Sequence, residues 1–358
     1  MKKTRVAVIF GGRSGEHEVS LVSATSIIKA LNPSKYDVME IGITLEGVWL
    51  QGPGTLDKFK KKDYSGLNNV DFSMGENDKG FDIAFPVLHG PYGEDGTIQG
   101  LFEMLNMPYV GCGVLASSTC MDKLQTKAIW EAAGLPVVPY VSMTRFAWAR
   151  EEDEIVKKIE EKFGYPCFVK PANMGSSVGI SKAKNRDSLI KAIHDAAKYD
   201  NRILVEQGVD AREIECAVLG NNNPVVSVPG EIIVGGEFYD YFDKYVNGKS
   251  SSKIPARMAP KLIDEAKELS LKAYKVLDCS GLARVDSFLD RKTEKFYLNE
   301  INTMPGFTSI SMYPKMMEAA GLGYEELIDK LIALGFERFE ERKKNRVAFD
   351  SGSDWYVK

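Results

Sequence analysis

Apolar and polar positions in the first third of the chain follow an order that predicts strands separated by helices. Residues 20–31 and 97–105 have helical spacing. The three short apolar runs beside them, bounded by turn residues as buried strands are, read RVAVIF, YDVMEIGIT and FDIAFPVL. Because helices usually connect parallel strands, this order predicts an open parallel α/β layer.

The rest of the chain predicts helices mixed with antiparallel strands. The middle third contains, in order, a helix at 123–133, the strand LPVVPYVSM, the helix EEDEIVKKIEEKF, the strands YPCFVK and VGISK, a helix at 186–199 and the strand RILVEQ. From AREIECAVLG onward the pattern becomes antiparallel, with helices at 259–277, 315–319 and 324–339. We expect two α+β parts to follow the N-terminal layer.

Three stretches show neither the helical nor the strand periodicity of apolar residues. Residues 51–79 are polar with scattered Gly and Asp, so we expect irregular surface structure in a variable insertion. The tail KKNRVAFDSGSDWYVK has no clear pattern. The long loop EFYDYFDKYVNGKSSSKIPA holds too many aromatic residues to suggest disorder, and it includes Lys244 and Tyr245. A lid that excludes water from a reaction site suits such a loop.

The segment ARVDSFLD-RKTEK-FYLNEIN predicts an antiparallel hairpin that carries oxygen ligands. Glu300 and Asn302 share a face because strand side chains repeat every two residues, and Asp286 lies nearly opposite them. These donors suit Mg²⁺ on nucleotide phosphates better than zinc. Arg284 lies on the same face as Asp286, where it could meet negative oxygens. A solvated edge hairpin is the alternative, and the hairpin alone leaves both interpretations open.

A second candidate site for phosphate is the loop NMGSSVG, which follows the strand YPCFVK. Its glycines allow backbone N–H groups to approach phosphate oxygens, and Ser176 and Ser177 add hydroxyl donors. The Walker spacing is absent and a strand follows, so this loop would be a flexible flap rather than a P-loop. Lys170 ends the preceding strand and favours phosphate binding, as does Lys123 in CMDKLQTK. A simple hairpin turn with solvated lysines is the alternative.

Two loops of the N-terminal layer lie where an open α/β sheet places its ligands. GGRSGEHEVS includes Glu16, and LHGPYGEDGT includes His89, one of three histidines. The G-x-G-x-x-G fingerprint is absent, so a nicotinamide site is poorly supported. Glu16 with the adjacent helix start could instead hold the ammonium and carboxylate of an amino acid. For each loop alone, a tight turn with an acidic helix cap is the favoured interpretation. The convergence of both loops at one sheet edge is the stronger argument for a ligand site.

Composition narrows the class of protein. With 358 residues, 44% hydrophobic and 27% charged, the chain is long enough for two or three globular domains. A net charge of −4 disfavours a nucleic-acid or anionic-membrane surface. The five cysteines are widely spaced and show no C-x-x-C pair, which indicates free thiols in a reducing compartment. The first apolar run, VAVIF, is too short for a signal sequence or membrane span, so we expect a cytoplasmic location.

Taken together, the motifs resemble the D-alanine:D-alanine ligases of the ATP-grasp superfamily over nearly the whole chain. The blocks occur in the family's order: GGRSGEHEVSLVSA, VLHGPYGEDGTIQG, CMDKLQTK, FVKPANMGSSVGISK, FYDYFDKY, RVDSFL and NEINTMPGFTSISMYP. The resemblance implies an α/β and α+β ATP-grasp fold. It divides the chain into an N-terminal domain at 1–121, a central subdomain with the flap at 122–212, a C-terminal subdomain with lid and metal hairpin at 213–340, and a tail at 341–358.

The resemblance also implies the activity. An ATP-dependent ligase of this family joins two D-alanines through an acyl phosphate, releasing ADP and phosphate, for peptidoglycan synthesis. Two Mg²⁺ or Mn²⁺ ions would accompany ATP, and a homodimer is expected. Neither nucleic acid nor membrane would be a partner.

Residue roles carry over by motif position. Asp286, Glu300 and Asn302 would bind the metal. Nucleotide contacts are expected from the residues Lys123, Lys170, Ser176, Ser177, Glu206, Gln207, Val209, Glu213 and Asn299, with the lysines at the phosphates, residues 206–209 at adenine and Glu213 at the ribose.

The amino-acid substrates would meet a second group of residues. Glu16 would bind the first ammonium, in a hydrogen-bond network with Ser176 and Tyr245. Arg284 and the backbone of Gly306 would form the oxyanion site. Further substrate contacts are expected from His89, Lys244, Ser311 and Met312, with Ser311 at the second carboxylate and Met312 at the second side chain.

Other functions stay open at this point. Related ligases that use D-serine or D-lactate share most of these blocks; Tyr245 disfavours D-lactate and leaves D-serine open. A dinucleotide oxidoreductase and a non-catalytic nucleotide-binding protein are more remote alternatives. D-alanine-stimulated ATP hydrolysis would separate them from a ligase.

Overall fold

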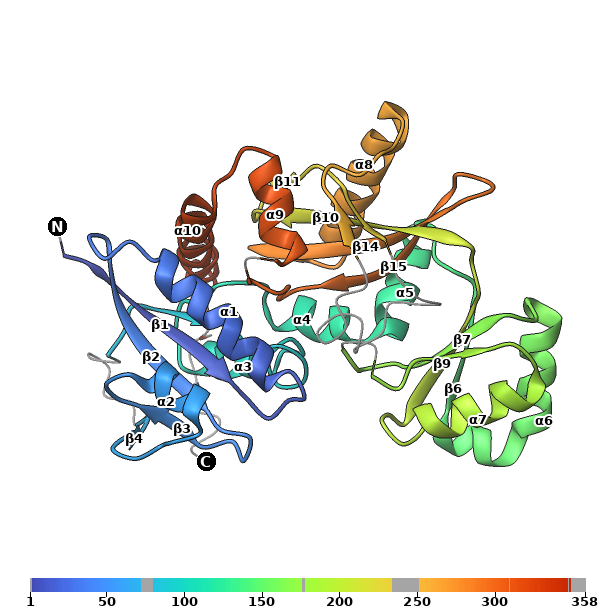
Figure 1. Ribbon diagram of the computed structural model, residues 1–358, viewed down its shortest axis with the longest axis horizontal. Helices are drawn as coiled ribbons and strands as arrows, with labels where there is room; N and C mark the ends of the chain where they lie inside the picture. Colours follow the sequence, from blue (N-terminus) through green and yellow to red (C-terminus); the bar gives the residue numbers. More distant parts are fainter. Residues whose placement is uncertain are drawn as a thin grey trace, which may run out of the picture.

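The computed structural model, which describes residues 2–71, 80–175, 178–233, 251–308, 310–346 and 348, contains three separate sheets (Figure 1). The N-terminal sheet has the strand order β4-β3-β2-β1-β5. Its strands are β1 (Thr4–Gly11), β2 (Tyr36–Ile43), β3 (Trp49–Gln51), β4 (Asn68–Asn69) and β5 (Ile83–Pro86). β1 runs parallel to β2 and β5, whereas β3 runs antiparallel to β2 and β4. The parallel arrangement of the three predicted strands is therefore confirmed. The sheet also has an antiparallel edge, β3 and β4, which was not predicted, because a tight turn rather than a helical crossover follows β2.

The helices of this first part are α1 (His17–Ala30), α2 (Thr55–Lys61), α3 (Thr97–Met104) and α4 (Val114–Met121). The expectation of irregular structure at 51–79 is wrong for α2, whose Phe59 is fully buried against Phe10. Gly42 makes room for it, since a Cβ at that glycine would lie 2.3 Å from the Phe59 ring. The short helix is thus stabilised by packing that its own polar sequence does not reveal.

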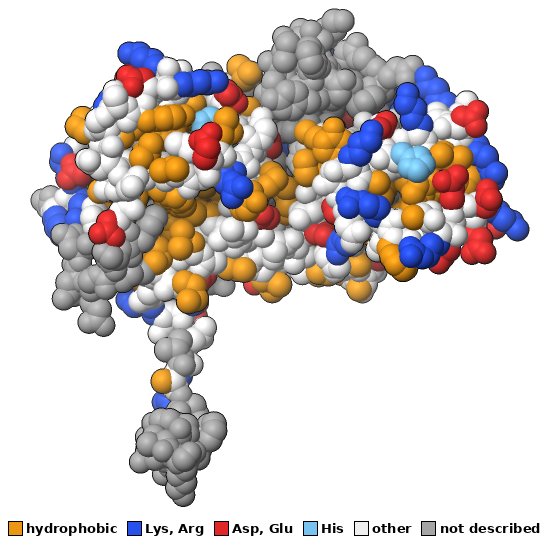
Figure 2. All heavy atoms as spheres, turned by 90° about the horizontal axis from the view of Figure 1, so that it is seen from below, with side chains coloured by type: hydrophobic (Ala, Val, Ile, Leu, Met, Phe, Trp, Pro, Cys, Tyr) orange, Lys and Arg blue, Asp and Glu red, His pale blue; other side chains and the backbone are white. Residues whose placement is uncertain are grey.

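The central sheet is antiparallel and has the order β6-β9-β7-β8. It consists of β6 (Tyr140–Thr144), β7 (Cys167–Pro171), β8 (Ser181–Ala183) and β9 (Arg202–Gln207). α5 (Lys123–Ala132) leads into it, and α6 (Arg145–Lys162) and α7 (Arg186–Ala196) cover it with their apolar faces. Figure 2 shows side chains of both charge signs interspersed on this lobe, as on an ordinary solvated surface.

The third sheet has the order β13-β12-β10-β14-β15, with β11 beside β10. Its strands are β10 (Ala211–Leu219), β11 (Val225–Val226), β12 (Gly230–Ile233), β13 (Ser251–Lys253), β14 (Leu282–Asp290) and β15 (Phe296–Asn302). The predicted hairpin is confirmed as β14 and β15. α8 (Pro260–Val276), α9 (Met312–Ala319) and α10 (Tyr324–Arg342) complete the fold.

The N-terminal and third sheets share a hydrophobic core, whereas the central sheet has its own. Leu327 and Leu331 of α10 lie in one cluster with Val6 of β1 and Ile27 of α1. Figure 1 shows the central sheet as a separate lobe, joined to the other two through α5 and the start of β10. None of the described helices is long and apolar enough to cross a membrane. All five cysteines are buried and none forms a disulfide, as predicted.

Candidate active site

A cavity of about 1240 Å³ lies where the three parts of the chain meet. Every candidate residue that the structure describes lines it: Glu16, His89, Lys123, Lys170, Glu206, Gln207, Val209, Glu213, Arg284, Asp286, Asn299, Glu300, Asn302, Gly306, Ser311 and Met312. The other four candidates, Ser176, Ser177, Lys244 and Tyr245, lie outside the described residues. Residues from segments far apart in the sequence thus converge on one space large enough for a nucleotide and a small second substrate.

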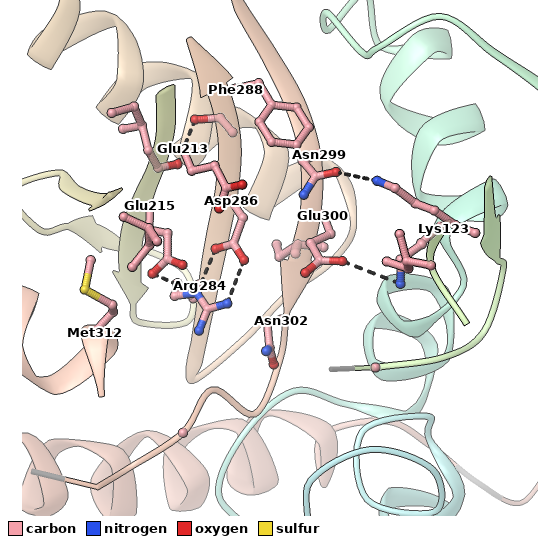
Figure 3. Close-up of a pocket in the computed structure, with 18 of the residues that line it drawn as sticks. Lys123, Glu213, Glu215, Arg284, Asp286, Phe288, Asn299, Glu300, Asn302 and Met312 are labelled. Carbon is pink, nitrogen blue, oxygen red and sulfur yellow. Dashed lines mark hydrogen bonds and ion pairs between the residues drawn. The ribbon is translucent and has the colours of Figure 1, made fainter. Parts of the chain in front are cut away.

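The β14–β15 hairpin supplies the acidic wall of this cavity (Figure 3). Asp286 lies directly opposite Glu300, and Arg284 lies opposite Asn302. The register then shifts, because Ser287 pairs with Leu298 and leaves Asn299 as an extra residue. In a regular strand Asn299 would face away from Glu300; the bulge brings both into the cavity.

Arg284 is shared by two carboxylates. Its Nε and an amino group donate to the two oxygens of Asp286 at 2.7 and 2.6 Å, and Nε lies 3.2 Å from an oxygen of Glu215. Burial would lower the pKa of Arg284, but Asp286 and Glu215 outweigh it and raise that pKa, so the guanidinium stays charged. An arginine held by two carboxylates is fixed in direction, as a group that stabilises developing negative charge must be.

Glu215 is a cavity residue that sequence reasoning missed. It lies on β10 directly opposite Asp286, is nearly buried, and lines the cavity. The sequence does contain a pattern that points to Glu215. In AREIECAVL, Glu213 and Glu215 are two residues apart on a strand and therefore share a face, so a nucleotide contact at Glu213 places Glu215 on the same side.

The opposite wall carries lysines. Lys123 donates to the carbonyl of Met174 at 2.8 Å, and its Nζ lies 3.5 Å from Glu300. Lys170 donates to Oδ1 of Asn299 at 3.1 Å, and its Nζ lies 2.5 Å from Glu206. The two lysines therefore connect α5 and the central sheet to the acidic hairpin.

Glu206 also pairs with Lys127, which sequence reasoning missed. Nζ of Lys127 lies 2.8 Å from Oε1 of Glu206. Burial alone would raise the pKa of Glu206, but Lys127 and Lys170 lower it to about 2. The four-residue spacing of Lys123 and Lys127 in CMDKLQTK was the available signal, since it places both on one helix face.

The third wall comes from the N-terminal loops. His89 is buried, with Nδ1 3.1 Å from the carbonyl of Met304 and Nε2 3.0 Å from Oγ of Ser23. Burial lowers the pKa of His89, which favours the neutral ring. The carboxylate of Glu16 lies beside two glycines, since an added Cβ would stand 2.9 Å from it at Gly90 and 3.2 Å at Gly175. Glu16 thus joins the N-terminal loops to the start of the candidate flap.

Glu94, expected only as part of a helix start, also lines the cavity. Gly96 is the N-cap of α3, so the expected acidic cap is wrong; Asp95, one residue earlier, accepts from the backbone N–H of Thr97 at 3.0 Å. Glu94 accepts from the backbone N–H of Gly90 at 2.9 Å, and burial together with Glu16 raises its pKa well above the usual value.

The segment after β15 forms the remaining edge. Oγ of Ser311 accepts from the backbone N–H of Thr308 at 3.0 Å, which fixes its position beside Gly306. Met312 begins α9 and packs against Gly230 of β12.

The hairpin has the donors that Mg²⁺ prefers. Asp286 and Glu300 are paired across the strands, and Asn302 follows two residues after Glu300. No group of three His, Cys, Asp or Glu side chains arranged for a metal occurs among the described residues, so a metal here would rest on two carboxylates and one amide. An ionised carboxylate keeps acceptor sites beyond the two that Arg284 uses on Asp286, so the donor set fits.

An antiparallel four-stranded sheet that faces a larger sheet across a cavity, with lysines on one side and acidic residues on the other, defines the ATP-grasp class of enzymes. The comparisons with known proteins narrow the class. Residues 5–112 match the family model described as D-ala D-ala ligase N-terminus, and residues 129–333 match that described as D-ala D-ala ligase C-terminus. The chain belongs to the D-alanine–D-alanine ligase family and is a ligase.

Individual relatives agree with this assignment. The D-alanine–D-alanine ligase of Acetivibrio thermocellus is 50% identical, over 96% of this chain and 98% of that protein. The enzyme of Heliobacterium modesticaldum is 49% identical with the same coverage. Among solved structures, the D-alanine-D-alanine ligase from Coxiella burnetii is 36% identical with a TM-score of 0.84, covering 96% of this chain and 97% of that one. The VanG D-Ala:D-Ser ligase from Enterococcus faecalis is 39% identical with a TM-score of 0.83, covering 93% and 100%.

Proposed function

We propose that this ligase joins two molecules of D-alanine to D-alanyl-D-alanine for peptidoglycan synthesis, with cleavage of ATP to ADP and phosphate. The observation that carries the proposal is the single cavity in which the lysine wall, the acidic hairpin and Arg284 meet the two N-terminal loops. Lysines suit nucleotide phosphates, and a carboxylate such as Glu16 suits the ammonium of an amino acid.

The first step would form an acyl phosphate. A carboxylate oxygen of the first D-alanine attacks the γ-phosphorus, and the bond to the ADP oxygen breaks. Lys123 and Lys170 offset the negative charge on the phosphates, while Glu16 holds the ammonium of the attacking molecule. Mg²⁺ or Mn²⁺, as two ions held with ATP by Asp286, Glu300 and Asn302, would supply further charge neutralisation at the phosphates.

The second step would form the amide bond. The deprotonated amine of the second D-alanine, with its carboxylate at Ser311 and its methyl group at Met312, attacks the acyl carbon. The tetrahedral oxyanion would be stabilised by Arg284 and the backbone N–H of Gly306, and phosphate then leaves. Water exclusion by the loop that contains Lys244 and Tyr245 would protect the acyl phosphate from hydrolysis.

We further propose that the chain divides at residues 121, 212 and 340 into the N-terminal domain, the two ATP-grasp subdomains and the tail. It would act as a homodimer in the cytoplasm. Light scattering would then give twice the chain mass of 39.7 kDa.

D-serine is the second candidate for the accepting substrate, because the VanG D-Ala:D-Ser ligase has nearly the same fold. A phosphate-release assay with D-alanine alone, and with D-alanine plus D-serine or D-lactate, separates the possibilities. We expect full activity with D-alanine alone and no gain from the added substrates. Product analysis showing mainly D-alanyl-D-serine would contradict the proposal.

A further inference from the structure

Lys127 is a fully buried lysine that does not itself line the cavity. It lies on α5 one helical turn after Lys123, with 0% of its surface exposed. Its Nζ lies 2.8 Å from Oε1 of Glu206, a residue that does line the cavity. A charged side chain is rarely buried completely unless its charge serves a partner.

Glu206 stands between two cations. Lys127 takes Oε1, and Lys170 lies 2.5 Å from Oε2. Two positive charges therefore share one negative charge, and the surplus is positive. Lys170 is the member of the pair that lines the cavity, so it presents the surplus charge there.

We propose that Lys127 is a positioning residue, which neutralises Glu206 from behind so that the charge of Lys170 remains available for the phosphates of the nucleotide. This inference rests on the proposed phosphate-binding role of Lys170. Without Lys127, Glu206 and Lys170 would form a neutral pair, and Lys170 would have to leave the carboxylate of Glu206 in order to reach a phosphate. Lys127 thus acts on the nucleotide only through Glu206.

The test measures the affinity for ADP with Mg²⁺ by calorimetry. In Lys127→Met we expect the dissociation constant to rise about tenfold or more, the range for loss of one charge-assisted contact. KM for ATP should rise accordingly, with a much smaller change in kcat. Adenosine has no phosphate but would still meet Glu206 at its adenine ring, so it should lose much less affinity than ADP does.

Removing the charge of Glu206 should abolish this effect. In the Glu206→Gln background, adding Lys127→Met should change ADP affinity less than about threefold, because no anion remains to capture Lys170. The double variant buries no unpaired carboxylate, so if Lys127→Met alone does not fold, a loss of ADP affinity well above threefold between Glu206→Gln and the double variant would still overturn the proposal. An equal loss of ADP affinity in both backgrounds would overturn the proposal, as would an equal loss for adenosine.

Lys162 offers a matched control. Like Lys127, it lies 5.9 Å from the centre of the Tyr140 ring, but its Nζ donates to the carbonyl of Tyr140 and it is solvent-exposed. Lys162→Met should leave ADP affinity unchanged. Lys170→Met tests the premise separately. If this variant binds ADP normally, the phosphate-binding role of Lys170 is wrong. If Lys170→Met loses ADP affinity and Lys127→Met does not, only the role of Lys127 is overturned.

Discussion

At the scale of single residues, charge sharing organises the cavity. Arg284 lies between Asp286 and Glu215, and Glu206 lies between two lysines. Glu206 is buried, and Arg284 is mostly buried with 17% of its side chain exposed. Each ion has two partners of opposite charge, which offsets the cost of removing it from water and fixes its direction. Preorganised charges of this kind need no rearrangement when charge develops during a reaction.

Replacing Arg284 by Ala should lower kcat about 10²-fold or more, because the oxyanion would lose its charged donor. Phosphate release at saturating ATP and D-alanine measures this. Arg186→Ala, which removes a guanidinium bound to Glu160 on the surface, is the control and should keep normal turnover. Arg284→Lys retains a charge between the buried carboxylates and should recover stability better than activity. A near-normal kcat in Arg284→Ala would refute the role.

Glu206 should make stability depend on pH in the acid range. Its pKa is lowered to about 2 in the folded protein, against an ordinary value of 4.5. Above pH 4.5 its stabilising contribution, on the order of 3 kcal/mol, is fully present, and it is lost as the pH falls toward 2 because protonation then favours the unfolded chain. Urea unfolding between pH 3 and 6 measures the free energy of unfolding. This free energy should depend less on pH in the double variant with Lys127→Met and Glu206→Gln than in the unmodified protein. An equal pH dependence in the two proteins would contradict the role of Glu206.

At the scale of elements, close approaches between segments position the site. The bulge in β15 turns Asn299 toward Lys170. In the same sheet, Gly230 lies on β12, toward the end of the strand order opposite to β15. Because this residue has no side chain, α9 can pack against β12, with Met312 at the contact. The position of Met312 in the cavity therefore depends on a glycine in another strand.

Gly230→Ala should displace Met312. The added Cβ would lie 2.4 Å from Cε of Met312 and 3.0 Å from Sδ of Met316, so both side chains must move. We expect the KM for the second D-alanine to rise several-fold, with a stability loss of about 1–3 kcal/mol from overpacking. Initial-rate kinetics over a range of D-alanine concentrations measures the first effect. Gly100→Ala in α3, where nothing lies within 4 Å, should leave both KM values unchanged.

At the scale of the whole molecule, the N-terminal part and the third sheet behave as one packed body. They share a core, and α10 is tied to the first part by Lys35 and Tyr36, which both contact Asp329. Near the start of β14, the backbone of Gly281 approaches that of Gly111, so the two parts touch without intervening side chains. The central lobe, with its own core, is the part best suited to move relative to the others.

Gly281→Ala should weaken this junction. Its Cβ would lie 3.1 Å from the backbone of Gly111, and φ is +71°. Gly134 is a matched control, because its φ of +72° imposes the same backbone strain while nothing lies within 4 Å. We expect Gly281→Ala to lower the melting temperature more than Gly134→Ala does, by the additional steric cost of about 1 kcal/mol or more. Equal shifts in calorimetry would show that only backbone strain matters.

Local patterns predicted much of this architecture. Apolar runs located most of the strands and helices, and the period-two rule placed Asp286 opposite Glu300. The same rules missed α2, because its stability comes from Phe59 packing beside Gly42. They also missed the antiparallel edge of the first sheet, since strand direction depends on how the chain turns after β2.

The sequence by itself determined the type of chemistry. Motif spacing and strand periodicity involve residues only a few positions apart, so they can be read before the fold is known. Tertiary structure decided which charges meet. Lys127 with Glu206, Glu215 with Arg284, and Asn299 with Lys170 join segments distant along the chain. The physical reason is that such pairs depend on sheet order, a strand bulge and the path of a helix, none of which local periodicity encodes.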